Sequence, residues 1–377
     1  MSRFIGKLCK HMDEKFNNKA ILASECNCAR GLMNKATFLE KKIINMTSYI
    51  PHSRTHALKT FNFPLTKSLV KRDDELGFGI SGSKWRKYTS LIPYLISNNY
   101  QEAVVIGSAY SNHVLGITQL LIENRIKPTL FLLGSPTIKR QGNLLLTSLL
   151  VPESQVHWIS RKNWPNVEAL AQSYVENNDS TIVIPEGACM DQALPGALTL
   201  AMDILRNEQE NQLKFQHIFV DAGTGLSAIA LILAFAWINK QTLVHVLLLA
   251  DEEPQFLDKL KLFQHSFEQF VEDELDWTAL LEGFRLYRPT LACSFGSVNA
   301  AIISHIKFLA REEGFFTDPI YSAKLFWEAK NIISAQAIEG NILMVHSGGA
   351  LTLMGFQKEL IDNNNCVIDS GSQRNPL

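Results

Sequence analysis

The chain has 377 residues, 46% of them hydrophobic and only 19% charged, so it is long enough to bury a sizeable core in one large or two smaller domains. Its 36 basic and 37 acidic side chains leave a net charge of −1, which excludes a bulk field for nucleic acid or an anionic membrane and leaves small molecules or other subunits as partners. Six scattered cysteines without a Cys-x-x-Cys pair, and no apolar run long enough to span a bilayer, predict a cytoplasmic protein with reduced thiols.

The first part of the chain gives few structural signals. Residues 1–46 show no sustained helix or strand periodicity, so we interpret them as an N-terminal extension of uncertain order. Asp73, Asp74 and Glu75 form an acidic cluster that no histidine or cysteine joins at ligand spacing. A solvated acidic turn is therefore expected there rather than a metal site.

Residues 82–87, Gly-Ser-Lys-Trp-Arg-Lys, are the most informative stretch of the sequence. Lys84 follows a flexible Gly-Ser pair and comes just before an amphipathic run that begins at Tyr88. A lysine at a helix start lies near the positive end of the helix dipole, and the neighbouring Arg86 and Lys87 also favour its neutral, nucleophilic form. The same residues are consistent with a solvated basic turn.

Three segments repeat the order strand, small-residue loop, helix, which is typical of a parallel sheet with crossover helices. The expected strands are 103–107, 129–133, 217–221, 244–249 and 342–346, and the expected helices are 113–123, 226–237 and 351–360. Such loops gather at the carboxyl ends of the strands, where helix N-termini and glycines bind anions. The pattern predicts a ligand that carries a phosphate or a carboxylate.

The loop at Gly223-Thr-Gly225 has three interpretations. Residues 223–228 match the dinucleotide pattern G-x-G-x-x-A, and Asp251 follows the next strand where a ribose-binding acid would lie. The same loop is suited to a single terminal phosphate, with Thr224 and Ser227 as additional donors. It is also consistent with a tight turn that only lets strand and helix pack.

Two further loops contain candidate binding groups. Ser111, Asn112 and His113 open a helix, so they either cap it or bind a carboxylate. His346 ends a strand, where a structural histidine is the more common case, and the glycine pair 348–349 indicates a close approach of the backbone to a ligand or a helix.

Seven motifs in order together resemble the pyridoxal-phosphate enzymes that comprise 1-aminocyclopropane-1-carboxylate deaminase and D-cysteine desulfhydrase. The resemblance covers about residues 65–360. Its motifs are 69–77, 82–87, 106–113, 142–146, 223–225, 315–321 and 346–349.

The resemblance implies an α/β fold of two domains and three layers with mostly parallel sheets, like the β subunit of tryptophan synthase and other fold type II pyridoxal-phosphate enzymes. The larger, cofactor-binding domain would be built from 47–87 and 198–365. The smaller domain, 88–197, would be inserted into it, and 366–377 would be a tail. The cofactor, pyridoxal 5′-phosphate, would lie between the domains of a homodimer.

The family's functional residues can be carried over one by one. Lys84 would carry the cofactor covalently and later act as base on the substrate α-carbon. Asn112 would bind the ring's 3′ oxygen, and Ser347 would lie beside the pyridine nitrogen. Gly223, Thr224, Gly225 and Leu226 would cradle the phosphate through backbone N–H groups, with little need for charged side chains.

The substrate side of the site is implied in the same way. Ser111, Asn112 and His113 would receive the substrate carboxylate, with Ser111 among the catalytic residues. Tyr321 matches a family tyrosine that lies over the active site. Phe295 stands where the deaminases have a second tyrosine.

The chain departs from the family pattern at several positions. Ser83 replaces the usual asparagine before the lysine, Phe295 lacks a hydroxyl, and residues 184–190 contain fewer glycines than the family's version. Ser322 stands where deaminases place a glutamate that faces the pyridine nitrogen. A serine should leave that nitrogen largely neutral, which favours β-elimination over the opening of a cyclopropane.

The leading hypothesis is a lyase that removes the α-proton and a β-substituent from a small amino acid, D-cysteine first, and gives pyruvate and ammonia. The alternatives are a 1-aminocyclopropane-1-carboxylate deaminase, a catalytically weak homologue that binds the cofactor or another ligand, and a nicotinamide-dependent (NAD) dehydrogenase that uses residues 223–228.

Overall fold

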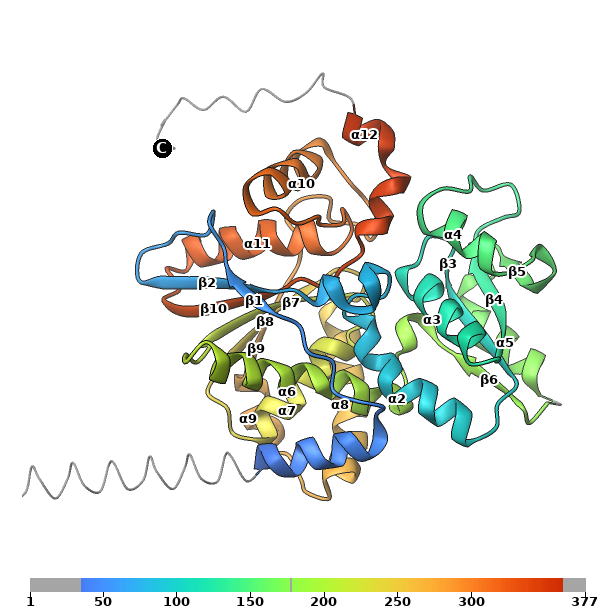
Figure 1. Cartoon of the computed structure of the whole chain (residues 1–377), viewed down its shortest axis with the longest axis horizontal. Coiled ribbons are helices and arrows are strands. Elements are labelled where there is room, and N and C mark those ends of the chain that lie inside the picture. Colours follow the sequence, from blue (N-terminus) through green and yellow to red (C-terminus); the bar gives the residue numbers. More distant parts are fainter. Residues whose placement is uncertain (1–34, 177, 362–377) are drawn as a thin grey trace, which may run out of the picture.

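Two mostly parallel sheets with helices packed against them form the protein (Figure 1), seen in a computed structural model that describes residues 35–176 and 178–361. One sheet has six strands in the order β1-β2-β10-β7-β8-β9, with only β1 antiparallel to its neighbour. The other has four parallel strands in the order β5-β4-β3-β6. The strands are β1 Thr55–Ala57, β2 Thr66–Lys71, β3 Glu102–Ser108, β4 Lys127–Leu133, β5 Val156–Ile159, β6 Thr181–Ile184, β7 His217–Ala222, β8 Leu243–Leu248, β9 Phe284–Tyr287 and β10 Gly340–Val345.

Helices connect nearly all of these strands. They are α2 Lys84–Ser97, α3 Asn112–Glu123, α4 Gly142–Leu150, α5 Val167–Val175, α6 Leu194–Glu210, α7 Leu226–Trp237, α8 Glu253–Val271, α9 Trp277–Glu282, α10 Ala300–Glu313, α11 Ser322–Ala335 and α12 Gln357–Ile361. Helix α7 is apolar on all sides because it is buried almost throughout. The described residues contain no helix that is both long and apolar enough to cross a membrane.

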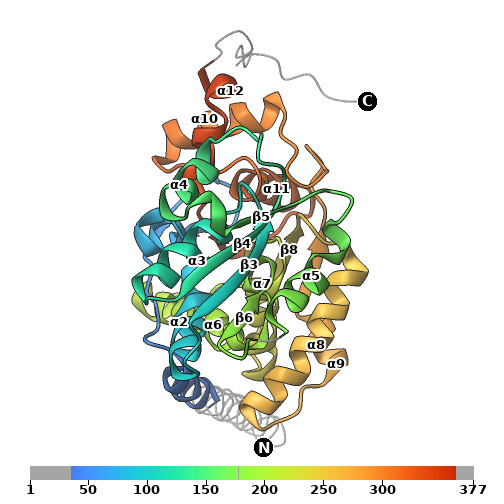
Figure 2. The same cartoon turned by 90° about the vertical axis from the view of Figure 1, so that its right-hand side faces the viewer.

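The larger sheet has an apolar core on each face. Phe219 and Met344 pack with Phe326 of α11 on one face, whereas Val220 and Leu343 belong to the core that contains α6 and α7. The smaller sheet lies between α3 and α5, as Figure 2 shows. This alternation along each strand follows from the two-residue period of β structure.

The strands of the smaller sheet all lie within 102–184, and the larger sheet takes strands from both sides of that segment. The arrangement places the start of α2 next to the carboxyl ends of the strands of the larger sheet, since Ser83 N donates to Ser347 O beyond β10. The exact domain limits at 87/88 and 197/198 stay a prediction.

Three local expectations need correction. Residues 35–46 form a helix that buries Leu39 and Ile43, so the N-terminal extension is ordered there, whereas 1–34 lie outside the described residues, as does the tail 366–377. The expected helix 351–360 is a 3₁₀ segment, Ala350–Gly355, that ends before α12. The acidic turn is not simply solvated, because Asp73 is fully buried and bonded to Arg86.

Candidate active site

Lys84 is the first residue of α2 and follows a turn that is locked to the loop after β10. Gly82 has a φ of +55°, and a Cβ there would lie 2.2 Å from the backbone oxygen of Ser347. The next residue, Ser83, donates its N–H to the same oxygen at 3.0 Å. The turn therefore requires glycine at position 82, and it fixes Lys84 relative to Ser347.

The amine of Lys84 lies at the carboxyl ends of the strands of the larger sheet. Its Nζ is 5.4 Å from the ring centroid of Tyr321. Burial lowers the pKa of Lys84, and the charges of Asp221 and Asp318 offset part of that effect. Within the described ranges, Nζ has no hydrogen bond or ion pair, so the amine is free to react.

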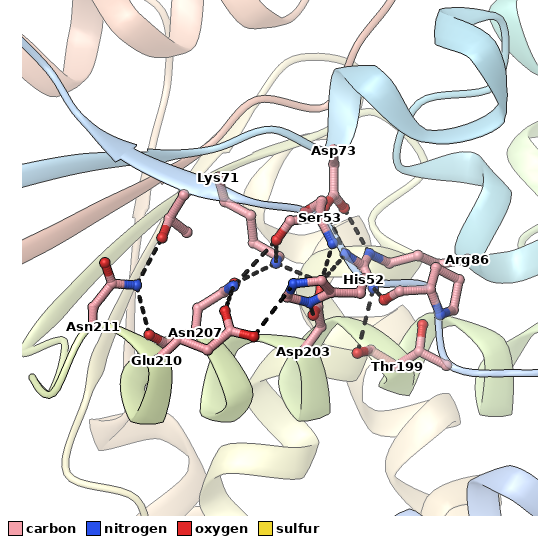
Figure 3. A network of polar contacts seen from close by, with 12 residues as sticks. His52, Ser53, Lys71, Asp73, Arg86, Thr199, Asp203, Asn207, Glu210 and Asn211 are labelled. Atoms are coloured by element: carbon pink, nitrogen blue, oxygen red, sulfur yellow. Dashed lines mark hydrogen bonds and ion pairs between the residues drawn. The ribbon is translucent and has the colours of Figure 1, made fainter.

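Arg86, which the sequence argument treated as a charge acting on Lys84, instead anchors α2 (Figure 3). Its guanidinium makes two 2.6 Å hydrogen bonds to Asp73 and one of 2.7 Å to Asp203 of α6. Lys71 of β2 also bonds Asp203, at 2.5 Å, and all four side chains are at most 2% exposed. This buried network joins β2, α2 and α6 two residues after Lys84.

The glycine loop after β7 forms an anion cradle at the N-terminus of α7. Gly225 is the N-cap of α7 with a φ of +91°, and Leu226 is the first helical residue. A Cβ on Gly223 would lie 3.0 Å from Cε1 of Tyr321, so this loop approaches the same ring as Lys84 does. Backbone N–H groups at such a terminus bind phosphate.

Two lysines that sequence reasoning did not assign lie beside the cradle. Lys87 Nζ donates to Gly187 O at 2.9 Å, and a Cβ on Gly187 would lie 2.5 Å from Thr224 Oγ1. Lys259 Nζ lies 3.5 Å from Thr224 O. The helical spacing of Lys84 and Lys87 was the available signal, because residues three apart share a helix face.

The Ser111-Asn112-His113 motif divides between structural and potentially ligand-facing groups. Ser111 caps α3, its Oγ accepting from the backbone N–H groups of His113 and Val114. The imidazole of His113 is buried, with Nδ1 3.0 Å from the Tyr88 hydroxyl. Their proposed contact with a substrate carboxylate stays a prediction.

Asn112, by contrast, is oriented by its neighbours. Its Oδ1 accepts from Asn143 Nδ2 at 2.7 Å and from Thr352 Oγ1 at 3.1 Å. A Cβ on Gly349 would lie 3.0 Å from Asn112 Nδ2. With Oδ1 already occupied, the amide presents Nδ2, a hydrogen-bond donor, beside the 347–349 loop.

Tyr321 precedes α11 and is held by Asp318. The Asp318 carboxylate accepts from the backbone N–H of Ile320, Tyr321 and Ser322, and also from the Ser322 hydroxyl. Ser322 is fully buried, so its hydroxyl serves this cap. Phe295 is 52% exposed and its ring lies edge-on to Tyr321 at 6.0 Å.

The structure thus brings Lys84, Gly223, Tyr321 and Ser347 together, and places Phe295 at the margin of this group. It also adds Asp221, which sequence reasoning counted only as part of a strand. Burial raises the pKa of Asp221 to about 6, and a hydrogen bond from Ser347 opposes the rise. An acid in an otherwise apolar strand was the missed signal.

These residues fit pyridoxal phosphate. A primary amine without a hydrogen-bonding partner, an amide donor at Asn112 and a glycine cradle beside two lysines match the aldehyde, the ring oxygen and the phosphate of that cofactor. Lys84, Asp221, Thr224, Tyr321 and Ser347 all keep partial solvent access between buried neighbours, as groups around a ligand would.

Comparisons with known proteins agree with this description. No protein-family model matches the chain. It is 25% identical over 366 residues to the bifunctional D-cysteine desulfhydrase/1-aminocyclopropane-1-carboxylate deaminase, mitochondrial, of Arabidopsis thaliana, which covers 89% of both chains. A provisionally named 1-aminocyclopropane-1-carboxylate deaminase of Pyrococcus abyssi is 21% identical over 296 residues, 78% of this chain and 87% of its own.

Solved structures show the same fold. A structure described as an ACC deaminase homologue has a TM-score of 0.74 and 19% identity, covering 85% of this chain and 98% of its own. Diaminopropionate ammonia lyase of Escherichia coli has a TM-score of 0.59 and 11% identity, covering 87% of this chain and 91% of its own. The expected α/β fold with mostly parallel sheets, that of fold type II pyridoxal-phosphate enzymes, is confirmed.

Proposed function

Since this chain is a homologue of proteins named 1-aminocyclopropane-1-carboxylate deaminase and D-cysteine desulfhydrase, we propose that it is a pyridoxal-phosphate-dependent lyase. Its reaction is β-elimination from a small amino acid, with D-cysteine the first candidate and pyruvate and ammonia the products. The observation that carries the proposal is the position of Lys84, a partly buried amine 5.4 Å from the Tyr321 ring, which the glycine cradle also approaches.

Each part of the site has one task in holding the cofactor. Lys84 would hold its aldehyde, residues 223–226 and the nearby Lys87 would hold its phosphate, and Asn112 would donate a hydrogen bond to its ring oxygen. When bound, pyridoxal phosphate withdraws electrons from the α-carbon of an amino acid and makes the proton there acidic.

The acid–base roles follow from the two opposite pKa shifts. Burial lowers the pKa of Lys84, which favours the neutral amine and makes it suited to accept the α-proton. Burial, with Asp318 and Asp221 nearby, raises the pKa of Tyr321 well above its ordinary value. Tyr321 therefore stays protonated and serves as a hydrogen-bond donor above the site, while Lys84 is the base.

Two features favour elimination over the opening of a cyclopropane ring. Phe295 contacts Tyr321 but brings no hydroxyl to exchange a second proton. Ser322, in the place of the deaminases' glutamate, is already bonded to Asp318. Neither side chain supplies the extra acid–base group that ring opening needs.

The test joins a covalent readout to a product readout. Purified protein is mixed with pyridoxal phosphate, reduced with borohydride and analysed by peptide mass spectrometry, and pyruvate release is measured with D- and L-cysteine, D-serine and 1-aminocyclopropane-1-carboxylate. We expect modification of Lys84, pyruvate from D-cysteine, and loss of both in Lys84→Ala. Lys330→Ala, which changes a lysine packed on the rings of Phe61 and Phe308, is the control.

The alternatives have distinct outcomes. An unmodified Lys84 in the saturated wild type would overturn the proposal. Modification without pyruvate from any substrate would identify a binding homologue. A dehydrogenase would be revealed by NADH fluorescence, but Asp251, the acid it would need for ribose, is paired with Lys259 at 2.7 Å. A homodimer and a cytoplasmic location are further proposals, which sedimentation and fractionation test.

A further inference from the structure

Asp221 is a buried acid for which the proposed reaction has no role. It lies at the end of β7, which pairs with β10 through Phe219 and Met344. Asp221 lies two residues beyond Phe219, and Ser347 lies three residues beyond Met344, just past the end of β10, so the two belong to the same edge of the sheet. Because side chains alternate along a strand, Asp221 shares the face of Phe219, the face that α11 and Tyr321 cover.

The site contains a second acid, Asp318, but the two carboxylates differ in their hydrogen bonds. Asp318 accepts from backbone N–H groups and the hydroxyl of Ser322, so it is fully used at the start of α11. Asp221 has an oxygen, Oδ1, that is buried and has no hydrogen-bond partner among the described residues. Leaving a buried acceptor unpaired costs about 1–3 kcal/mol, so this oxygen is available to a donor that enters the site.

Ser347 is the neighbour through which Asp221 can act. The pairing of β10 with β7 brings Ser347 next to the end of β7, and its hydroxyl opposes the effect of burial on the pKa of Asp221. Lys84 and Asp318 are the charged groups that act on this carboxyl. A hydroxyl has a single proton. If it donates to Asp221, its oxygen can only accept a hydrogen bond from whatever lies on its other side.

We propose that Asp221 is a positioning residue that orients the Ser347 hydroxyl and thereby keeps the pyridine nitrogen of the bound cofactor protonated. The inference rests on the proposed function and on the family resemblance, which implies that this nitrogen lies beside Ser347. Without Asp221, the Ser347 hydroxyl would donate its proton to a neutral ring nitrogen. With Asp221 present, the hydroxyl donates to the carboxylate, and its oxygen would accept a hydrogen bond from a protonated ring nitrogen. The carboxylate would then stabilise the positive charge of the ring.

This proposal replaces the expectation that the ring nitrogen is largely neutral because Ser322 stands in place of the deaminases' glutamate. The acid lies instead behind Ser347, on a different strand, where the local motif does not reveal it. A protonated ring is the stronger electron sink, so the arrangement supports removal of the α-proton by Lys84.

The experiment measures the protonation of the ring nitrogen directly. Protein loaded with pyridoxal phosphate labelled with ¹⁵N in the ring is titrated by NMR, as wild type, Asp221→Asn, Ser347→Ala and the double variant. We expect a protonated nitrogen in the wild type at pH 7. Asp221→Asn should lower the nitrogen's pKa by about one unit or more, as loss of a nearby opposite charge does. Because Asp221 acts through Ser347, the double variant should give nearly the same nitrogen signal as Ser347→Ala alone.

The outcomes separate this inference from the proposed function. If the wild type takes no cofactor at Lys84, the proposed function fails. If the wild type binds the cofactor but Asp221→Asn leaves the nitrogen signal unchanged, only the role of Asp221 is refuted. If Asp221→Asn lowers the nitrogen's pKa equally with and without the Ser347 hydroxyl, the proposal that Asp221 acts through Ser347 is refuted. Asp273→Asn, at an exposed ion pair with Lys35, is the charge-matched control. Should Asp221→Asn not fold, Asp221→Ser or Asp221→Ala replaces it, since the loss of charge is what matters.

Discussion

Asp203 is expected to be the most sensitive charged residue for stability, because it balances two buried cations. Its carboxylate is fully buried and bonds Lys71 at 2.5 Å and Arg86 at 2.7 Å (Figure 3). In Asp203→Asn, Arg86 keeps both hydrogen bonds to Asp73, but Lys71 is left with only neutral acceptors. Removing one partner of a buried pair costs about 3–5 kcal/mol.

The assay is urea unfolding of the wild type and Asp203→Asn, with Glu75→Gln as control. Glu75 pairs with Arg54 on the surface, where the side chains are 57% and 41% exposed, so its loss should cost about 0–1 kcal/mol. An Asp203→Asn protein within 1 kcal/mol of the wild type would refute the reasoning, because Lys71 would then be able to remain buried without a carboxylate.

The same residue predicts a pH dependence. Burial opposes the charge on Asp203, but Lys71 and Arg86 outweigh it and lower its pKa from 3.8 to about 2. A lowered pKa in the folded state gives stability that is present above the unfolded value and lost as the pH falls towards 2, about 2 kcal/mol in all. The stability difference between wild type and Asp203→Asn should shrink over this range, and a constant difference would contradict the assignment.

Three further predictions test the site and its support. Asn143→Ala should weaken pyridoxal-phosphate binding about fivefold, because Asn112 loses a hydrogen bond of about 1 kcal/mol that orients its amide. A Kd that fluorescence titration finds unchanged would argue against this orientation. Gly196→Ala should lower the free energy of unfolding by about 1–3 kcal/mol, since the new Cβ would lie 2.2 Å from the backbone oxygen of Arg86. An unaltered Tm would show that α2 and α6 can move apart to accept the methyl group. Tyr321→Phe should retain cofactor but lower pyruvate release about 100-fold, as loss of a positioned proton donor does, and full activity would remove its hydroxyl from the reaction.

Much of the fold could be predicted from the sequence because its strands and helices are local patterns. The expected helix 226–237 has the observed bounds. The strand expected at 103–107 is one residue shorter than β3 at each end, and the one expected at 217–221 is one residue shorter than β7 at its carboxyl end. The continuous helix expected at 351–360 was wrong, because a 3₁₀ segment, Ala350–Gly355, follows Gly349 and ends before the short helix α12 begins at Gln357. The helix at 35–46 was missed because only Leu39 and Ile43 mark its buried face.

The candidate site was predictable only where its residues belong to continuous motifs. Lys84, the glycine loop and Ser347 were identified from such motifs. The burial of Asp73, although this residue belongs to the motif 69–77, and the position of Asp221 in the site were not identified, because the surroundings of both come from chain segments far away in sequence. Arg86 and Ser53 surround Asp73, and a neighbouring strand brings Ser347 to Asp221. The sequence shows that Asp221 is an acid inside an apolar strand. Its neighbour Ser347, however, is known only once the order of the strands in the sheet is known.

The turn before Lys84 has different tolerances at its two adjacent positions. Ser83 holds the loop after β10 through its main-chain N–H, and any residue except proline supplies that group. The missing asparagine amide at this position therefore leaves the spacing between the lysine and Ser347 intact. Gly82, in contrast, cannot be replaced, because the carbonyl oxygen of Ser347 fills the volume that a side-chain methyl group would need. Position 83 should therefore accept other small side chains, since Ser83 is only 8% exposed, whereas position 82 has to remain glycine.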